Sequence, residues 1–440
     1  MDKLLFSFDS SLVSKDDLRN CSAILSSEIE KMNRARGKGY SDGRSIINLP
    51  FDAANLKDLK KVIAEKKREK PSILAMAGIG GAVLGTIAVH EAVNGKRHND
   101  SFPKIRPFFF DNADPDWTAS GLAIIEQALK KKEKVLAVIV SKSGTTTETI
   151  VNGELLLSLM KKYKRDITKE VVVVSTKESK FTEVAKQLGC TILSIPEVVP
   201  DRCSVFTNNH LFTLAMLDID IAQLLKGASD MVAQCLEKDS LKNPAALSAA
   251  VMYTNFRNGK NINDHFFFSV DLESVGKWYR QLMGESIGKE KDNNGKTVWT
   301  GPTPTVTIGS TDLHSLGQLY LGGPFDKLTT FVRVENNNNR VKVPVMKEFD
   351  SLVANIQGIQ MNSVMNAIYD GTKAAFIKGK RPFCEITLPD KSAYSIGQFL
   401  QFKLVEMIYL AALLNVNPFD QPNVESYKSE TRAILASGKR

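Results

Sequence analysis

The sequence predicts an α/β protein with two doubly wound αβα sandwich domains, each on a mainly parallel sheet, plus N- and C-terminal helices. Three observations predict this class: short apolar runs alternate with helix-period segments, the pattern occurs twice, and a break near 225–245 separates the two series. Apolar strands separated by helices are typical of parallel sheets covered on both faces. At 440 residues, the chain is long enough for two or three domains.

Four short β-branched or apolar runs form each series of expected strands. The first series is 72–78, 104–112, 134–140 and 171–175, and the second, after Asn243-Pro244, is 265–270, 304–309, 327–334 and 383–388. A long apolar helix over 395–416 and an amphipathic helix over 424–436 close the chain. The expected organisation is an N-terminal helical segment (1–60), a first domain (61–230), a second domain (245–390) and C-terminal helices (391–440).

Composition excludes several classes of protein. The net charge is +9, but the densest basic runs, 60–70 and 130–134, carry interleaved glutamates and fit solvated helix faces. We find no aromatic RNA-binding pattern, zinc finger or basic arm, so no nucleic-acid partner is expected. The five cysteines are widely spaced without a CxxC pair, which indicates reduced thiols and no metal site. No apolar run approaches the ~20 residues of a membrane span, so no membrane partner is expected.

The stretch SKSGTTTET, 141–149, places six hydroxyl side chains in nine positions directly after the expected strand 134–140. Ligands of open parallel sheets bind beyond the carboxyl ends of the strands, and a helix N-terminus there attracts anions. Gly144 permits close approach of the backbone, and the hydroxyls can donate to several phosphate oxygens. The candidate phosphate-binding residues are Ser141, Lys142, Ser143, Gly144, Thr145 and Thr146. A single hydroxyl would suffice as a helix cap, so this number favours phosphate over capping alone.

A second strand-to-helix junction, AGIGGAVLG at 77–85, is rich in glycine. Glycines at such a junction permit a tight turn and close packing of the helix, and alone they indicate either packing or binding. Together with the hydroxyl loop they predict one wall of a sugar-phosphate pocket, to which Gly81 and Ala82 contribute. Neither a Walker A pattern nor GxGxxG spacing is present, which argues against a nucleotide site.

Five segments, in chain order, resemble the bacterial-type glucose-6-phosphate isomerase family, which is built from two sugar-isomerase (SIS) domains. They are GIGGAVLG, VIVSKSGTTTET, KWYRQLMGESIGKE, GSTDLHSLGQLYLGGP and NVNPFDQPNVESYK. The resemblance spans roughly 70–430, and the blocks at 277–290 and 415–428 are long and highly specific. It implies two SIS domains that interconvert an aldose and a ketose phosphate, a reaction of glycolysis and gluconeogenesis.

Aldose-ketose isomerisation moves a proton between C2 and C1 of the open-chain sugar, so one base must reach both carbons. Within the block that carries the resemblance, Glu285 is the candidate base. Gln281 lies four residues earlier, on the same face of the expected helix, where it can hold a substrate hydroxyl. A glutamate at a helix end is otherwise an ordinary exposed residue; the surrounding block favours the catalytic interpretation.

The resemblance also implies an arginine that stabilises the enediolate, and Arg202 in VPDRCSV matches it. Here the sequence departs from most relatives, because Pro200-Asp201 stands where they carry Gly-Gly. Asp201 would either pair with Arg202 and weaken its effect, or orient it. Ala82 similarly replaces a serine that touches the substrate in many relatives, so one hydrogen bond is missing or is made by the backbone.

Ring opening needs an acid on the ring oxygen and a base on the anomeric hydroxyl. His314, in STDLHSLGQ, resembles the ring-opening histidine of the family, and Thr311 or Asp312 can supply an orienting partner. Lys428, in NVESYK, resembles the lysine assigned to ring opening and charge stabilisation. In the family the histidine belongs to the neighbouring subunit's site, which implies a homodimer with shared sites.

The sequence therefore predicts a cytoplasmic enzyme that interconverts glucose 6-phosphate and fructose 6-phosphate through an enediol(ate), with no metal or organic cofactor. Two alternatives stay open. One is a related isomerase acting on mannose 6-phosphate or an amino sugar phosphate. The other is a non-catalytic SIS regulator that binds a sugar phosphate, although such regulators usually lack the acid-base residues or carry an added DNA-binding domain.

Overall fold

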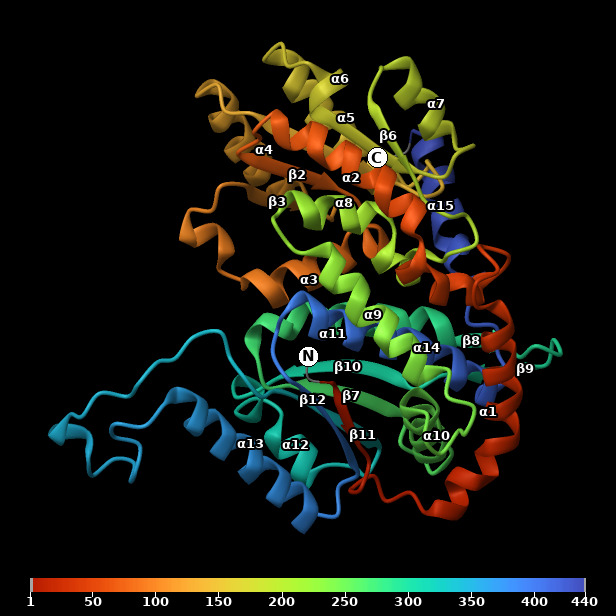
Figure 1. The fold of residues 1–440 in the computed structure, drawn as a ribbon, viewed down its shortest axis with the longest axis vertical. Helices are drawn as coiled ribbons and strands as arrows, with labels where there is room; N and C mark the ends of the chain where they lie inside the picture. Colours follow the sequence, from red (N-terminus) through yellow and green to blue (C-terminus); the bar gives the residue numbers. More distant parts are fainter. Residues whose placement is uncertain (1–2, 439–440) are drawn as a thin grey trace.

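The computed structural model describes residues 3–438 and arranges them in two lobes, each with a five-stranded sheet at its centre (Figure 1). The first sheet has the order β3-β2-β4-β5-β6, with all paired neighbours parallel. Its strands are β2 (Ile73–Ala77), β3 (Arg106–Phe110), β4 (Val135–Val140), β5 (Val171–Ser175) and β6 (Thr191–Ser194). The helices around it are α2 (Ala53–Arg68), α3 (Leu84–Asn94), α4 (Pro115–Lys130), α5 (Thr147–Lys162), α6 (Ile167–Glu170), α7 (Lys180–Gln187) and α8 (Asn208–Met216).

The strands of the first sheet are apolar throughout because both of their faces are covered. In β2, Leu74 and Met76 belong to the same hydrophobic core as α3 and α8, whereas Ile73 and Ala75 belong to the core that includes α4 and α5. Successive side chains of a strand point to opposite faces, so an uninterrupted apolar run is what a doubly covered strand requires. The predicted α/β class with parallel sheets is confirmed.

The second sheet has the order β1-β12-β11-β7-β10. Its strands are β1 (Leu5–Ser7), β7 (Ile262–Phe267), β10 (Thr303–Ile308), β11 (Lys327–Val334) and β12 (Phe383–Leu388). α12 (Gly317–Gly322) and α13 (Met361–Lys378) pack on an aromatic-rich face of this sheet. The other face packs against helices that include α1 (Lys15–Ala35), α10 (Pro244–Arg257), α11 (Glu273–Ile287) and α14 (Ala393–Leu414).

The N-terminal segment, expected to be helical, also supplies a strand. β1 pairs antiparallel with β12, at the edge of the second sheet. A three-residue strand has no periodicity of its own and forms only because an edge of the folded sheet is available, so local sequence does not reveal it. The sequence also did not predict β6 or the two-stranded antiparallel sheet of β8 (Lys289–Lys291) and β9 (Thr297–Thr300). The domain boundaries themselves stay a prediction.

α14 is the one helix in the described part of the chain that is long and apolar enough, by length and composition, to cross a membrane. The expectation that no apolar segment reaches this length was therefore wrong. Within the protein, 94% of its most apolar window is buried, and its close neighbours include α9 (Ile221–Cys235), α10 and α11. A helix surrounded by protein is apolar on all sides, so its composition reflects its central place in the core.

Candidate active site

The hydroxyl loop between β4 and α5 is organised by its own side chains. Ser141 Oγ accepts a hydrogen bond from Gly144 N (3.1 Å) and donates to Thr146 Oγ1 (3.2 Å). Ser143 Oγ accepts from Thr145 N (3.3 Å) and lies 3.5 Å from Thr146 Oγ1. The hydroxyls therefore gather at the N-terminus of α5, a 16-residue helix whose first N–H groups are available to an anion.

Gly144 is required by the shape of this loop. Its φ is +72°, and a Cβ at this position would lie 2.9 Å from both Cβ and N of Phe181. A left-handed conformation and a contact this close both exclude other residue types. The sequence therefore places glycine where the loop turns towards α7.

The glycine-rich junction after β2 makes a second close contact. It forms the short 3₁₀ helix η2 (Gly80–Ala82), and a Cβ on Gly81 would lie 2.3 Å from the carbonyl carbon of Asp201 and 2.5 Å from Arg202 N. His210 holds the same turn, because its Nε2 donates to Gly81 O at 3.0 Å. Gly81 therefore determines how closely the backbone that carries Arg202 approaches the first sheet.

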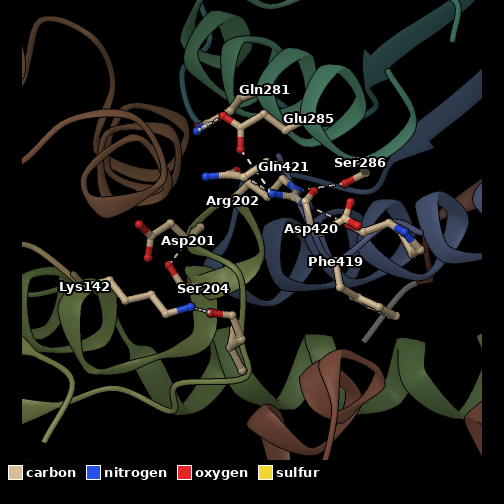
Figure 2. A network of polar contacts seen from close by, with 12 residues as sticks. Lys142, Asp201, Arg202, Ser204, Gln281, Glu285, Ser286, Phe419, Asp420 and Gln421 are labelled. Carbon is tan, nitrogen blue, oxygen red and sulfur yellow. Dashed lines mark hydrogen bonds and ion pairs between the residues drawn. The ribbon is translucent and has the colours of Figure 1, made fainter. Parts of the chain in front are cut away.

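Arg202 lies in the short 3₁₀ helix η4 (Asp201–Phe206), and its side chain is 1% exposed. Its guanidinium group makes five contacts (Figure 2). Nε donates to Ser286 Oγ (3.0 Å), Nη1 to Glu285 Oε2 (3.3 Å) and Gln421 Oε1 (2.8 Å), and Nη2 to the carbonyls of Pro418 (2.6 Å) and Asp420 (3.1 Å). Such a fork fixes both the position and the direction of the positive charge.

Asp201 does not pair with Arg202. Among residues 3–438 the structure gives no ion pair between them, so of the two alternatives left open by the sequence, the direct pair is not observed. Burial raises the pKa of the Asp201 carboxyl; the charges of Lys142, Lys428 and Arg202 lower it, and that of Glu285 raises it. The charges of four predicted site residues, from separate parts of the chain, therefore act on this one carboxyl group.

Lys142 reaches from the hydroxyl loop towards the segment that precedes η4. Its Nζ donates to Val199 O at 2.8 Å, and burial lowers its pKa despite the nearby carboxyl of Asp201. The phosphate loop and the arginine segment are thus joined by a direct contact.

Glu285 and Gln281 face the same site from the last turns of α11. Gln281 Nε2 donates to Glu285 Oε1 at 2.9 Å, which confirms that the two share a helix face. Glu285 is 29% exposed, and Gln281 Oε1 is buried without a hydrogen-bond partner in the described part of the protein. An unpaired buried oxygen beside a carboxylate is available to accept a hydrogen bond from a ligand hydroxyl.

Several residues of the site were missed by the sequence analysis. Lys289 donates to Glu285 O, and Ser286, Asp420 and Gln421 contact the guanidinium group of Arg202. A signal was present: polar side chains between the prolines of NPFDQP, just before Lys428, are typical of a turn that presents them.

Lys428 lies near the site, whereas His314 does not. Lys428 is in α15 (Val424–Ala436), where its Nζ donates to Glu425 Oε1 at 2.9 Å, and its charge acts on the Asp201 carboxyl. His314 is exposed after the carboxyl end of β10. Asp312 does not orient it, since Asp312 instead accepts from Ile308 N and Ser315 Oγ.

The separation of His314 from Glu285 follows from the course of α11. Gly284 faces Pro304, near the beginning of β10, whereas His314 follows the end of that strand. Six residues of strand span about 16 Å at ~3.3 Å per step. In Figure 1, β8 (Lys289–Lys291), which follows α11, lies to the right of the second sheet, whereas α12, which follows His314, lies below the sheet.

Two further features of the described residues bear on ligands. No group of three or more His, Cys, Asp or Glu side chains within 3–438 could hold a metal ion. A cavity of about 770 Å³ lies beside the carboxyl ends of β5 and β6, and none of the predicted site residues lines it.

Comparison with known proteins agrees with this architecture. Residues 69–439 match a family model described as phosphoglucose isomerase. The chain is 35% identical to a glucose-6-phosphate isomerase of Carboxydothermus hydrogenoformans over 84% of this chain and 80% of that one, and 32% identical to one of Methanocaldococcus jannaschii over 81% and 82%. A glucose-6-phosphate isomerase structure from Chlamydia trachomatis has the same fold, with a TM-score of 0.85 at 20% identity over 100% of this chain and 90% of that one. The chain therefore belongs to the phosphoglucose isomerase family.

Proposed function

We propose that this protein interconverts glucose 6-phosphate and fructose 6-phosphate. Relatives in its family carry the name glucose-6-phosphate isomerase, which supports this proposal. It is then an aldose-ketose isomerase of glycolysis and gluconeogenesis. The observation that carries the proposal is the 3.3 Å contact between Glu285, on the second domain, and the buried guanidinium group of Arg202, in η4 of the first. A carboxylate base and a fixed positive charge at one point are what proton transfer beside a carbonyl requires.

In the proposed mechanism, Glu285 takes the proton from C2 of the open-chain aldose and returns it to C1. Gln281 Nε2 holds the carboxylate through its 2.9 Å hydrogen bond. Gln281 Oε1, which has no partner in the described residues, accepts a hydrogen bond from a substrate hydroxyl. The negative charge of the enediolate forms next to Arg202. One preorganised donor of this kind contributes about 2.7–4 kcal/mol to the transition state.

We place the phosphate of the substrate in the hydroxyl loop. Ser141, Ser143, Thr145 and Thr146 supply hydroxyls, and the N-terminus of α5 supplies N–H groups and a partial positive charge. Lys142 adds a full charge at the edge of the loop, and Gly81 and Ala82 form the neighbouring wall. The net charge of +9 favours the approach of an anionic sugar phosphate at low salt.

We assign ring opening to His314 and Lys428, and propose that His314 acts in the site of a second copy of this chain. Support comes from the separation of about 16 Å along β10, which is too long for one small sugar to bridge from Glu285 in the same copy. Further support comes from the segment 336–360, which reaches away from the second domain (Figure 1). Its exposed apolar side chains are Val341, Val345, Met346, Phe349, Leu352 and Val353. A contiguous exposed apolar segment is typical of a protein interface.

Mixing two inactive variants tests the shared site. If Glu285→Gln and His314→Gln copies exchange subunits, half of the dimers are hybrids with one intact site, and about a quarter of wild-type activity returns. Mixed variants that stay inactive, although exchange is demonstrated by native mass spectrometry, contradict the sharing of sites.

A coupled assay with purified protein on fructose 6-phosphate tests the function. Glucose 6-phosphate and mannose 6-phosphate are measured separately, because the departures at Asp201 and Ala82 are where a different sugar preference would arise. Glucose 6-phosphate is the expected product. Proton transfer through an enediol needs no metal or organic cofactor, so the rate should be the same with EDTA. No product of either kind contradicts the proposal and favours a binding role.

We also propose a cytoplasmic location. The five cysteines are all free and buried, as is usual in a reducing compartment.

A further inference from the structure

Lys289, at the start of β8, is a buried lysine beside the candidate base. Its side chain is 6% exposed, and its ammonium group donates to three oxygen atoms. They are Glu285 O (3.0 Å), Asp420 O (2.5 Å) and Asp420 Oδ1 (2.9 Å). All three donors of the group are therefore used inside the protein.

These acceptors belong to the two parts of the chain that hold the reacting groups. Glu285 O is in the last turn of α11, and Asp420 lies in the turn 417–421 between α14 and α15. The Asp420 carbonyl also accepts from Arg202 Nη2 at 3.1 Å, so Lys289 and Arg202 share one oxygen atom. A movement of this carbonyl would shift both contacts at once.

The turn 417–421 is also held by its own side chains and by packing of Phe419 against the core and under Arg44. Asn417 Nδ2 donates to Asp420 Oδ2 (2.9 Å), and the ring of Phe419 packs against Gly43, where a Cβ would lie 2.2 Å from it. The turn belongs to neither sheet. Nevertheless, it gives three of the five acceptors of Arg202, namely the carbonyls of Pro418 and Asp420 and the amide oxygen of Gln421.

We propose that Lys289 is a positioning residue for the isomerisation: by fastening the turn 417–421 to the end of α11, it holds Arg202 at the correct distance from Glu285. The inference rests on the proposed function of these two residues. Lys289 does not face the substrate, because its donors are all directed to protein oxygen atoms. It acts through Arg202.

The effect should appear in turnover and not in binding. A displacement of about 1 Å in a positioned group lowers a rate by about 10²-fold, whereas the phosphate loop, which binds the far end of the sugar, is left unchanged. For Lys289→Met we expect kcat to fall about 10- to 100-fold with KM within about threefold of wild type. Lys289→Arg, which keeps a charged donor, should recover part of this loss.

The decisive experiment is a double-mutant cycle with Arg202→Ala. If Lys289 works by positioning Arg202, then Lys289→Met lowers kcat by less than about threefold in the Arg202→Ala background. Lys391→Met is the matched control, because Lys391 is another buried lysine paired with an aspartate, Asp271, away from the site. It should lower the melting temperature to a similar extent and leave kcat unchanged.

Three results would overturn the inference: unchanged kcat in Lys289→Met, an equal loss of kcat in both backgrounds, or an equal loss in Lys391→Met. If Lys289→Met does not fold, Asp420→Asn takes its place, with an expected loss of about three- to tenfold in kcat and the same dependence on Arg202.

The activity of the wild-type protein is measured first. An inactive wild-type protein contradicts the proposed function, whereas an active wild type with an unaffected Lys289→Met variant contradicts only this inference.

Discussion

The guanidinium group of Arg202 lies 3.3 Å from the carboxylate of Glu285, although the two residues come from different lobes of the protein. Arg202 donates five hydrogen bonds, one of them to Glu285, and the Glu285 carboxylate accepts a second hydrogen bond from Gln281. The charge is therefore fixed in place before any substrate arrives. Preorganisation of this kind needs no rearrangement at the moment of reaction.

Replacement of Glu285 by Gln should remove turnover and keep binding. The amide has nearly the same shape but cannot accept the proton, so kcat should fall by about 10²- to 10⁴-fold. The coupled assay measures the rate, and calorimetry with fructose 6-phosphate measures the affinity. Glu273→Gln, on the first turn of the same helix, is the control and should keep its activity. A Glu285→Gln variant that isomerises normally would show the mechanism to be wrong.

Replacement of Arg202 by Ala should lower kcat more than it weakens binding. The guanidinium group acts chiefly on charge that appears in the transition state, so a loss of about 10²- to 10³-fold in kcat is expected. Because Arg202 is buried and its removal leaves several acceptors unpaired, the melting temperature should also fall.

Arg202→Lys separates these two effects. It keeps the charge but loses the fork, so it should recover stability better than rate. An unchanged rate in both variants would mean that Arg202 does not stabilise the enediolate.

Replacement of Gly81 by Ala should displace η4. The new Cβ would lie 2.3–2.5 Å from backbone atoms of Asp201 and Arg202, and backbone yields less easily than a side chain. Overpacking of this kind typically destabilises by about 1–3 kcal/mol, and the shift of Arg202 should lower kcat by at least about tenfold. Gly371→Ala in α13 is the matched control, since a Cβ there meets no atom within 4 Å. Equal thermal and kinetic behaviour of the two variants would contradict the close contact.

Asp201→Asn should stabilise the protein at neutral pH. Burial raises the pKa of the Asp201 carboxyl above its ordinary value of 3.8. Between 3.8 and the raised pKa, the folded state binds a proton that the unfolded state has released, so this group lowers stability as the pH rises through that window. The amide removes this effect, because it carries no charge.

Thermal unfolding from pH 4 to pH 8 measures the difference. The melting temperature of Asp201→Asn should exceed that of the wild type at pH 7, and the gain should shrink as the pH falls towards 4. Asp350→Asn, at an exposed aspartate, is the control and should show no such trend. A variant less stable than the wild type at pH 7 would mean that the charged form of Asp201 is favoured in the folded protein by Lys142 and Lys428.

Local sequence pattern predicted much of the fold, because a strand covered on both faces is an uninterrupted run of apolar residues. The eight expected strands all correspond to observed ones, and β4 is apolar at every position for the same reason that it is buried at every position. β1, β6, β8 and β9 were missed. β1 forms only because it can pair with β12 at the edge of the sheet. The sequence of three residues does not show that their partner strand lies near the other end of the chain.

The site was predictable by residue type but not by contact. The hydroxyl loop and Glu285 can be named from their blocks, whereas nothing in its block indicates a role for Lys289. The turn NPFDQP indicates that Asp420 and Gln421 are presented, but not that they contact Arg202. The effect of Asp201 on Arg202 was also undecided. Whether Asp201 pairs with Arg202 depends on which other acceptors the fold places around the guanidinium group. Three of these acceptors come from the turn 417–421.

By itself, the sequence determined the chemical groups and the parallel sheets, because residue type and periodicity are local properties that a chain carries unfolded. Only the tertiary structure decided which groups meet. Arg202 faces Glu285 and not its neighbour Asp201, and His314 is removed from both by the length of a strand. Such pairings depend on how helices and strands far apart in the chain pack, and packing follows from the shape and burial of the whole protein.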